Sequence, residues 1–520
     1  MSRRLFFSLF IWTLLLTPTG CAPAPSVASF PTFVLVTQDP NASPTPTPFQ
    51  PSLVNATPLP TFTLPPPATN TPEPTVTPLV IPTTALPSVN TSAPPITSTR
   101  TNYILNTTID FDTRTIKVDE TIRYYNNTGA TLNDIVLAVQ PNRYSNCFLL
   151  NSVAQDNTPL SSYTVNDQRM TITLPAPLPP GTAATFTINF DLFLPVKRSE
   201  SLFGYDFNQI NLVDWYPFIV PYSGGWVLHD PMPFGEHLVY DASDIEVNIK
   251  AAPEIIIAAS APAEANGEWT RYRLYGARTF ALSASDEFLM DESAVGAVVI
   301  RSYYFAGYEG AGAGMLRAAV NSVALFDVKF APYPYASLAV VQTDIHDGQE
   351  YDGLVFLATD FYGQYGGSAK SNLVTIGVHE IAHQWWFGLV GSDQALEPWL
   401  DEAMSVYSER IFYEWSYPNY GDWWWQFRVD YFGPSGYVDT PIYSGGTFRA
   451  YTNAVYLNGA HFIEELRWQM GDDNFYRFLK DYAARYSRGS ATSYDFFAVA
   501  REHSSADISD LINAYFQGDY

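Results

Sequence analysis

One segment constrains the fold more than any other, the run NLVTIGVHEIAHQWWFGLV from Asn372 to Val390. Drawn as a helix, it carries apolar residues all round, so it should be buried in a core rather than lie on a surface. A buried helix needs other elements around it, and the hydrophobic fraction of 47% is sufficient to form such a core. We therefore expect the C-terminal part of the chain to be a mainly helical globular domain.

The same segment contains a His-Glu-x-x-His sequence, His379-Glu380-Ile381-Ala382-His383. Residues four apart share one face of a helix, so both imidazoles can reach a single metal ion. Glu380 is turned by about 100° around the helix axis, where it can address a water bound to that ion. For the bare motif, two histidines in a helix without metal are the alternative.

A zinc site of the hydrolytic kind needs a third protein ligand and leaves a fourth position to water. Glu402 follows His383 after 18 intervening residues, in a second predicted helix from Trp399 to Trp415. A buried carboxylate needs a partner, and the apolar neighbours of Glu402 disfavour the alternative of a solvated helix face. We expect one zinc ion per chain, held by His379, His383 and Glu402. Zinc lowers the pKa of a bound water to about 7, and Glu380 is the expected general base.

The first 21 residues are typical of a lipoprotein signal peptide. Arg3 and Arg4 precede an apolar run, and small residues lead to Gly20 and Cys21. The run is shorter than the roughly 20 residues that a membrane-spanning helix needs. We expect lipid attachment at Cys21 and a location on the outer face of a bacterial membrane. Ordinary cleavage near this point, followed by secretion, is the alternative.

Residues 22–100 hold 20 of the 40 prolines and only three charged residues. This composition cannot form a core, so the segment is predicted to be an extended linker rich in Pro and Thr.

Residues 101–295 contain short alternating runs such as TIKVDETIRYY and ATFTINFDLFLP, separated by Asn, Gly and Pro clusters. Such runs are typical of strands, so we expect an antiparallel β domain here. Residues 296–520 turn to mixed structure and then to helices, and they form the expected catalytic domain. Thr492 and Asp495 are predicted to make a capping box at the start of the last helical stretch.

The formal net charge of −25 argues against nucleic acid or an anionic lipid surface as the main partner. Only two cysteines exist, Cys21 and Cys147. Once Cys21 carries lipid, no disulfide can form within the chain, so packing must stabilise an exported protein.

The run HEIAHQWWFGLVGSDQALEPWLDEAMSVYSE resembles the signature of the aminopeptidase N-like gluzincin metallopeptidases. It has the ligand spacing, the Trp after the second His and the Trp-Leu-x-Glu approach to the third ligand. Asp401 and Ala403 stand where the family usually has Asn and Gly.

The resemblance covers most of residues 101–520. It implies an α+β multidomain protein, in which an N-terminal β domain precedes a thermolysin-like catalytic domain. We expect the protein to lack the long C-terminal helical domain of many members, and its cleft to be more open.

The resemblance implies a role for a tyrosine in YTNAVYLNGA. Tyr456 corresponds to the family's catalytic Tyr, which stabilises the oxyanion, with Tyr451 five residues earlier and Gly459 shortly after it. A tyrosine with a purely structural place in the core is the alternative.

The segment DGQEYDGLVF resembles in part the Gly-x-Met-Glu-Asn segment with which the family binds the substrate's free amine. Glu350 corresponds to the amine-binding Glu, and Gly348 and Gln349 before it are the other expected substrate-binding residues. Asp347, Gln349 and Tyr351 depart from the family pattern. A surface carboxylate is the alternative for Glu350.

Together these features predict a zinc aminopeptidase that acts on peptides. An endopeptidase on the same scaffold is one alternative, and it would ignore the substrate's amine. A surface binding module without catalysis is the other, and the intact set of metal ligands, base and Tyr456 disfavours it.

Overall fold

The computed structural model describes residues 99–198 and 201–520. The predicted signal peptide, Cys21 and the proline-rich segment up to residue 98 lie outside the described residues. Within the described ranges, no helix is both long and apolar enough to cross a membrane.

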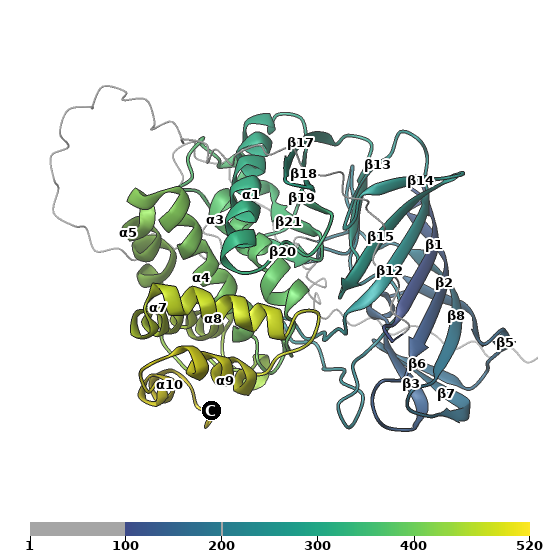
Figure 1. Cartoon of the computed structure of the whole chain (residues 1–520). Helices are drawn as coiled ribbons and strands as arrows, with labels where there is room; N and C mark the ends of the chain where they lie inside the picture. The colour runs from purple at the N-terminus through teal and green to yellow at the C-terminus, as the bar shows by residue number, and fades with distance from the viewer. Residues whose placement is uncertain (1–98, 199–200) are drawn as a thin grey trace, which may run out of the picture. The chain divides into compact units, whose positions relative to one another are not determined.

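An eight-stranded sheet runs through the N-terminal part (Figure 1). Along β2, Ile116, Val118 and Ile122 are buried while Lys117 and Asp119 are exposed, the alternation expected of a sheet with one face on a core. The pairing is antiparallel, as predicted, except between β1 and β12, which run parallel. In spatial order the strands are β14 (Ala263–Asn266), β15 (Trp269–Ala277), β12 (Ser243–Lys250), β1 (Asn102–Asp110), β2 (Thr115–Tyr125), β8 (Ala183–Phe193), β4 (Phe148–Gln155) and β5 (Thr158–Pro159).

Two four-stranded sheets complete the N-terminal part. The first comprises β13 (Ile256–Ala259), β16 (Leu282–Ser285), β10 (Ile210–Leu212) and β9 (Gly204–Tyr205). The second comprises β11 (Phe218–Ile219), β3 (Leu132–Ala138), β7 (Arg169–Leu178) and β6 (Tyr163–Asn166).

A five-stranded mixed sheet begins the part that carries the predicted motifs. In spatial order it contains β17 (Leu289–Val295), β18 (Val298–Tyr304), β19 (Ser337–Thr343), β21 (Leu354–Ala358) and β20 (Gly348–Tyr351). The three central strands are parallel, and β17 and β20 are antiparallel to their neighbours. Strand β20, which contains Glu350, is therefore an edge strand in the described part of the chain.

Helices pack beside this sheet (Figure 1). The α-helices are α1 (Glu309–Lys329), α2 (Thr359–Gly363), α3 (Asn372–Ala382), α4 (Trp399–Ser416), α5 (Gly421–Trp424), α6 (Phe448–Thr452), α7 (Gly459–Met470), α8 (Asp472–Arg485), α9 (Ser493–His503) and α10 (Ser509–Tyr515). Three segments are π-helical, namely η3 (Gln384–Leu389), η5 (Trp425–Val429) and η8 (Asn453–Asn458). Short 3-10 turns are η2 (Gln140–Arg143), η4 (Pro418–Tyr420), η6 (Asp430–Phe432) and η7 (Ile442–Ser444).

Helix α3 lies in the core, as its apolar sequence predicts. Every residue from Leu373 to Ala382 is buried, and the helix contacts α1, α4, β20 and β21. The predicted helix does not continue regularly to Val390, because η3 follows with a wider turn and Trp386 has φ −97° and ψ 30°. Such π turns often occur at functional sites.

The other helix predictions hold. Helix α4 begins at Trp399, as expected, and the capping box of Thr492 and Asp495 is present at the start of α9.

A segment of the β domain holds the end of β20 in place. The carboxylate of Asp352 accepts hydrogen bonds from the backbone amides of Arg278 and Thr279 at 2.8 and 2.7 Å. The N-terminal β part therefore helps to fix the strand that carries Glu350.

Candidate active site

His379 of α3 and His383, the residue that caps the end of that helix, point at one another. The Nε2 atoms of His379 and His383 are 3.2 Å apart, and both side chains are buried. The helical spacing of four residues produces this arrangement, because it places both rings on one face of α3.

Helix α4 brings the predicted third ligand to the same point. Oε2 of Glu402 lies 3.2 Å from Nε2 of His379 and 3.7 Å from Nε2 of His383. Ligand atoms that bind zinc tetrahedrally at about 2.0–2.1 Å are separated by roughly 3.3–3.4 Å. Two of the separations lie close to this value and the third, at 3.7 Å, is somewhat longer, so the donor set has the chemistry and nearly the spacing of a zinc site.

The other ring nitrogens of the histidines have partners of their own. Nδ1 of His379 lies 3.0 Å from Oε1 of Glu409, and Nδ1 of His383 lies 3.2 Å from Oγ of Ser405. Hydrogen bonds of this kind fix the tautomer and the orientation of a metal-binding imidazole. Burial tends to raise the pKa of Glu409, but the charge and hydrogen bonds of Arg428 and the bond to His379 lower it overall.

The sequence prediction missed Glu409 and Ser405. A signal was present, because Glu409 follows Glu402 by two helical turns and therefore lies on the same face of α4. A second Glu at that spacing in an apolar helix indicates a second carboxylate that contacts the same group of metal-binding residues.

Glu380 lies in the wall of a cavity of about 210 Å³ that the three ligands also line. One of its carboxylate oxygens is within 4.8 Å of donor atoms of His383 and Glu350. The chain of β20 passes so close that a Cβ atom on Gly348 would lie 2.3 Å from Oε1 of Glu380. Glycine at this position therefore leaves room for the carboxylate.

Tyr456 reaches the site from η8. Its ring stacks on the ring of His379, with centroids 6.2 Å apart and planes at 9°. Its hydroxyl donates a hydrogen bond to Oε1 of Glu402. Tyr451 is buried against Tyr456, with ring centroids 5.9 Å apart. A Cβ on Gly459 would meet Cβ of Ala403 at 2.5 Å, which accounts for a glycine there.

Glu350 faces a second carboxylate that the sequence prediction missed. Gln349 donates hydrogen bonds both to Glu236 and, at 2.8 Å, to Glu350. Glu236 belongs to the long segment between β11 and β12 in the N-terminal β part, and Gln394 holds its other oxygen. No local pattern marks Glu236, because it reaches Gln349 across 113 residues of sequence.

Burial and the neighbouring carboxylates disfavour the ionised forms of both Glu236 and Glu350. Burial, followed by the charge of Glu402, raises the pKa of Glu236 to about 7. Burial, followed by the charges of Glu236 and Glu380, raises the pKa of Glu350 well above its usual range. A cation placed between them would relieve this cost, because an opposite charge favours the ionised carboxylates.

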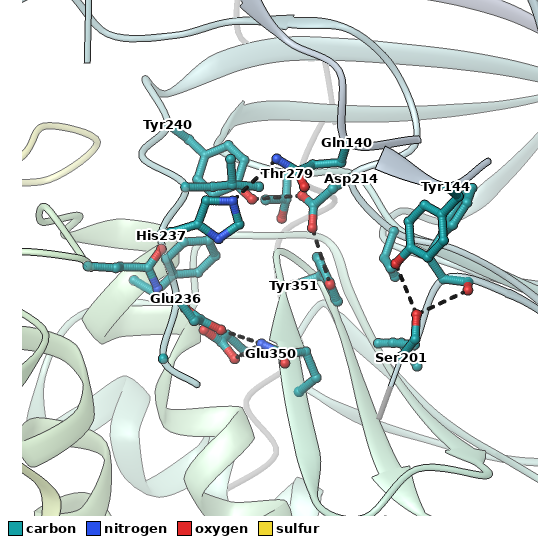
Figure 2. A pocket seen from close by; sticks show the side chains of 18 residues that line it. Gln140, Tyr144, Ser201, Asp214, Glu236, His237, Tyr240, Thr279, Glu350 and Tyr351 are labelled. Atoms are coloured by element: carbon teal, nitrogen blue, oxygen red, sulfur yellow. Dashed lines mark hydrogen bonds between the residues drawn. The ribbon is translucent and has the colours of Figure 1, made fainter. Parts of the chain in front are cut away.

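A second cavity, of about 310 Å³, borders this carboxyl pair (Figure 2). Glu236 and Glu350 border both this cavity and the one beside the metal ligands. The outer cavity also contains the carboxyl of Asp214, which accepts a hydrogen bond from Tyr240 at 2.7 Å. Neither Lys nor Arg is among its lining residues.

The fold and the arrangement of two histidines, a glutamate and a neighbouring buried glutamate define the class of gluzincin metallopeptidases. Residues 326–515 match the peptidase family M1 domain. This match supports the resemblance of the chain to the aminopeptidase N-like zinc metallopeptidases. The family resemblance, the fold class and the zinc cofactor predicted from the sequence are thereby supported. The assignment of the individual ligand residues stays a prediction.

Two relatives each match part of the chain. Aminopeptidase M1-B of Oryza sativa subsp. japonica is 27% identical over 232 residues, which are 42% of this chain and 26% of that protein. Endoplasmic reticulum aminopeptidase 1 of Rattus norvegicus is 27% identical over 195 residues, which are 35% of this chain and 21% of that protein. The matched regions thus span about a quarter of these relatives or less.

Two solved structures share the fold over most of the chain. A two-domain M1 zinc metallopeptidase variant bound to L-tryptophan superposes with a TM-score of 0.59 and 17% identity, over 81% of this chain and 94% of that one. The M1 zinc metallopeptidase from Deinococcus radiodurans gives a TM-score of 0.58 and 16% identity over the same shares.

Proposed function

We propose that the protein is a zinc-dependent aminopeptidase that removes the N-terminal residue of peptides. One observation carries the proposal beyond the family assignment. The carboxyls of Glu236 and Glu350 lie together at the border of the cavity that contains the metal ligands. A protonated α-amine is the substrate group that such a pair would bind.

The metal would be held by His379, His383 and Glu402. When bound, zinc supplies Lewis acidity, which activates a water and polarises the scissile carbonyl. Glu409 and Ser405 keep the two imidazoles in the orientation that this role requires.

Glu380 moves the protons of the reaction. Its carboxylate accepts a proton as water attacks the carbonyl, and then passes that proton to the leaving amine. Its place beside His383 and Glu350 supports this role. The close approach of Gly348 limits the freedom of its side chain.

Tyr456 stabilises the oxyanion that develops on the carbonyl. Its hydroxyl now donates to Glu402, and it can turn that hydrogen bond towards a neighbouring oxyanion. Contacts of this type lower a barrier by roughly 2.7–4 kcal/mol.

Glu236 and Glu350 set the position of cleavage. A charge-assisted hydrogen bond from the α-amine to a carboxylate contributes roughly 1.5–3 kcal/mol, and it fixes the scissile bond one residue from the end. An endopeptidase would not use this contact, and a binding module without catalysis would not need Glu380.

The test compares a short alanine peptide with its N-acetylated form. We expect acetylation to lower kcat/KM at least tenfold, and we expect Glu350→Gln or Glu236→Gln to reduce this difference by slowing the free-amine peptide. Glu254→Gln, at an exposed turn of the β part, is the matched control. Equal cleavage of both peptides, with internal bonds cut first, would favour the endopeptidase.

We also propose that the protein is exported and anchored by lipid at Cys21, which rests on the sequence alone. Cys21→Ser should then move the protein from the detergent-soluble membrane fraction to the aqueous fraction. Identical partitioning of both forms would exclude an anchor at this residue.

A further inference from the structure

A third cavity, of about 490 Å³, adjoins the catalytic one. Ile376 and Arg428 line both cavities, and Ile376 lies one helical turn before His379 on α3. The cavity beyond the Glu236 and Glu350 pair shares no lining residue with this third cavity. The cavity that contains the metal ligands therefore adjoins two spaces that are separate from one another.

The two outer spaces differ in charge. The lining of the third cavity includes Lys370 and Arg428 but no Asp or Glu. The lining of the cavity beside the Glu236 and Glu350 pair includes these two residues and Asp214 but no Lys or Arg. The cleft is acidic on the side that would bind an amine and basic on the other.

The basic side also offers hydrogen-bond donors. Ser371 and Asn372 line it at the start of α3, where the positive end of the helix dipole favours an anion. The side-chain nitrogen of Asn372 is shielded from water and has no hydrogen-bond partner within residues 99–198 and 201–520. A buried donor of this kind is costly unless something accepts from it.

The two cations are held differently. Arg428 is buried and donates to both oxygens of Glu409, at 2.7 and 2.8 Å, so its guanidinium is fixed in the wall between the cavities. Lys370 is exposed at the mouth, with Nζ 4.4 Å from the ring centre of Tyr420. Its flexible side chain can reach an anion that enters from solvent.

We propose that this cavity binds a carboxylate on the departing part of the substrate, so that the preferred substrates are short peptides with a free C-terminus. The proposal rests on the proposed aminopeptidase function. With the amine held at Glu236 and Glu350, the peptide extends past Glu380 towards Lys370 at about 3.3–3.6 Å per residue. The proposal places a carboxylate two or three residues from the amine at this end of the cleft.

The kinetic test compares Ala-Gly-Gly with a free C-terminus, the same peptide as its C-terminal amide, and Ala-Gly-Asp amide. We expect the free acid to be cleaved with a kcat/KM at least tenfold higher than that of the Ala-Gly-Gly amide. A high value for Ala-Gly-Asp amide also supports a carboxylate site, and assigns it to an acidic side chain as well as to the C-terminus. Equal values for all three peptides overturn the proposal.

Lys370→Gln should reduce the ratio between acid and amide at least threefold. Lys117→Gln, at an exposed position on β2, is the matched control and should leave the ratio unchanged. A ratio that is the same in Lys370→Gln and in the wild type contradicts the role of Lys370. Cleavage of the Ala-Gly-Gly amide is by itself enough to establish the aminopeptidase activity, because this peptide has a free amine and no carboxylate. A failure of the carboxylate site is therefore distinguishable from a failure of the proposed function.

A binding measurement gives a readout that does not depend on turnover. In the Glu380→Gln variant, calorimetry should show that Ala-Gly-Gly acid binds at least tenfold more tightly than its amide. Equal dissociation constants for the two peptides overturn the proposal even if turnover is absent.

Discussion

The guanidinium of Arg428 donates two hydrogen bonds to the carboxylate of Glu409, which in turn lies 3.0 Å from Nδ1 of His379. Trp424 donates a further hydrogen bond to Glu409 at 2.9 Å. The orientation of a predicted metal ligand therefore depends on η5, a segment distant from the His-Glu-x-x-His motif in sequence. This chain of contacts joins α3, α4 and η5 into one support for the site.

Glu409→Gln should weaken zinc binding by 10- to 100-fold, because it removes the charge that orients His379 and raises its basicity. Competition with a chromogenic chelator measures the change. Glu502→Gln, which alters an exposed ion pair with Arg485, is the matched control. Unchanged zinc affinity in Glu409→Gln would mean that Glu409 serves only the packing of α4.

Replacement of His379, His383 or Glu402 by Ala should abolish binding of the single zinc ion, since each removes one of three protein ligands. Glu380→Gln should retain the ion and lose turnover, because the amide cannot accept the proton. Elemental analysis and a peptide assay on the same preparations separate the two effects. Metal-free wild-type protein with full activity is the result that contradicts the zinc site.

Tyr456→Phe should lower kcat by two or more powers of ten and leave KM nearly unchanged, because the hydroxyl is proposed to act only on the transition state. The ring still stacks on His379, so the fold should survive. Tyr451→Phe is the natural comparison, since that ring packs against Tyr456. A large loss in Tyr451→Phe and none in Tyr456→Phe would exchange their roles.

The sequence predicted those parts of the site that lie close together along one helix or at a known spacing. His379, His383 and Glu402 belong to two consecutive helices, and periodicity places their side chains. Glu236 and Arg428 could not be found in this way, because only the packing of distant segments brings them to Gln349 and Glu409. The π-helical turn η3 was missed for a related reason. Its burial of two adjacent indoles, Trp385 and Trp386, depends on tertiary contacts.

A last prediction concerns the β part, where a carboxyl lies in the core. Glu120 of β2 is fully buried opposite Leu105 of β1 and Ile188 of β8. Neither of its oxygens has a hydrogen-bond partner in the described part of the chain. Burial raises its pKa well above the ordinary value of 4.5. The native state therefore holds a proton that the unfolded chain releases at a lower pH.

Because the native state binds this proton more tightly, the stabilising effect of protonation is complete below the unfolded pKa near 4.5. It is lost as the pH rises through the raised native pKa. Glu120→Leu removes both the unpaired oxygens and the titration, so it should raise the free energy of unfolding by about 1–3 kcal/mol at pH 8 and by less at pH 5. Urea unfolding of the zinc-saturated proteins at both pH values measures the difference, with the exposed neighbour Asp119→Asn as control. The same gain at both pH values would show that burial of a polar group, and not its ionisation, sets the cost of Glu120.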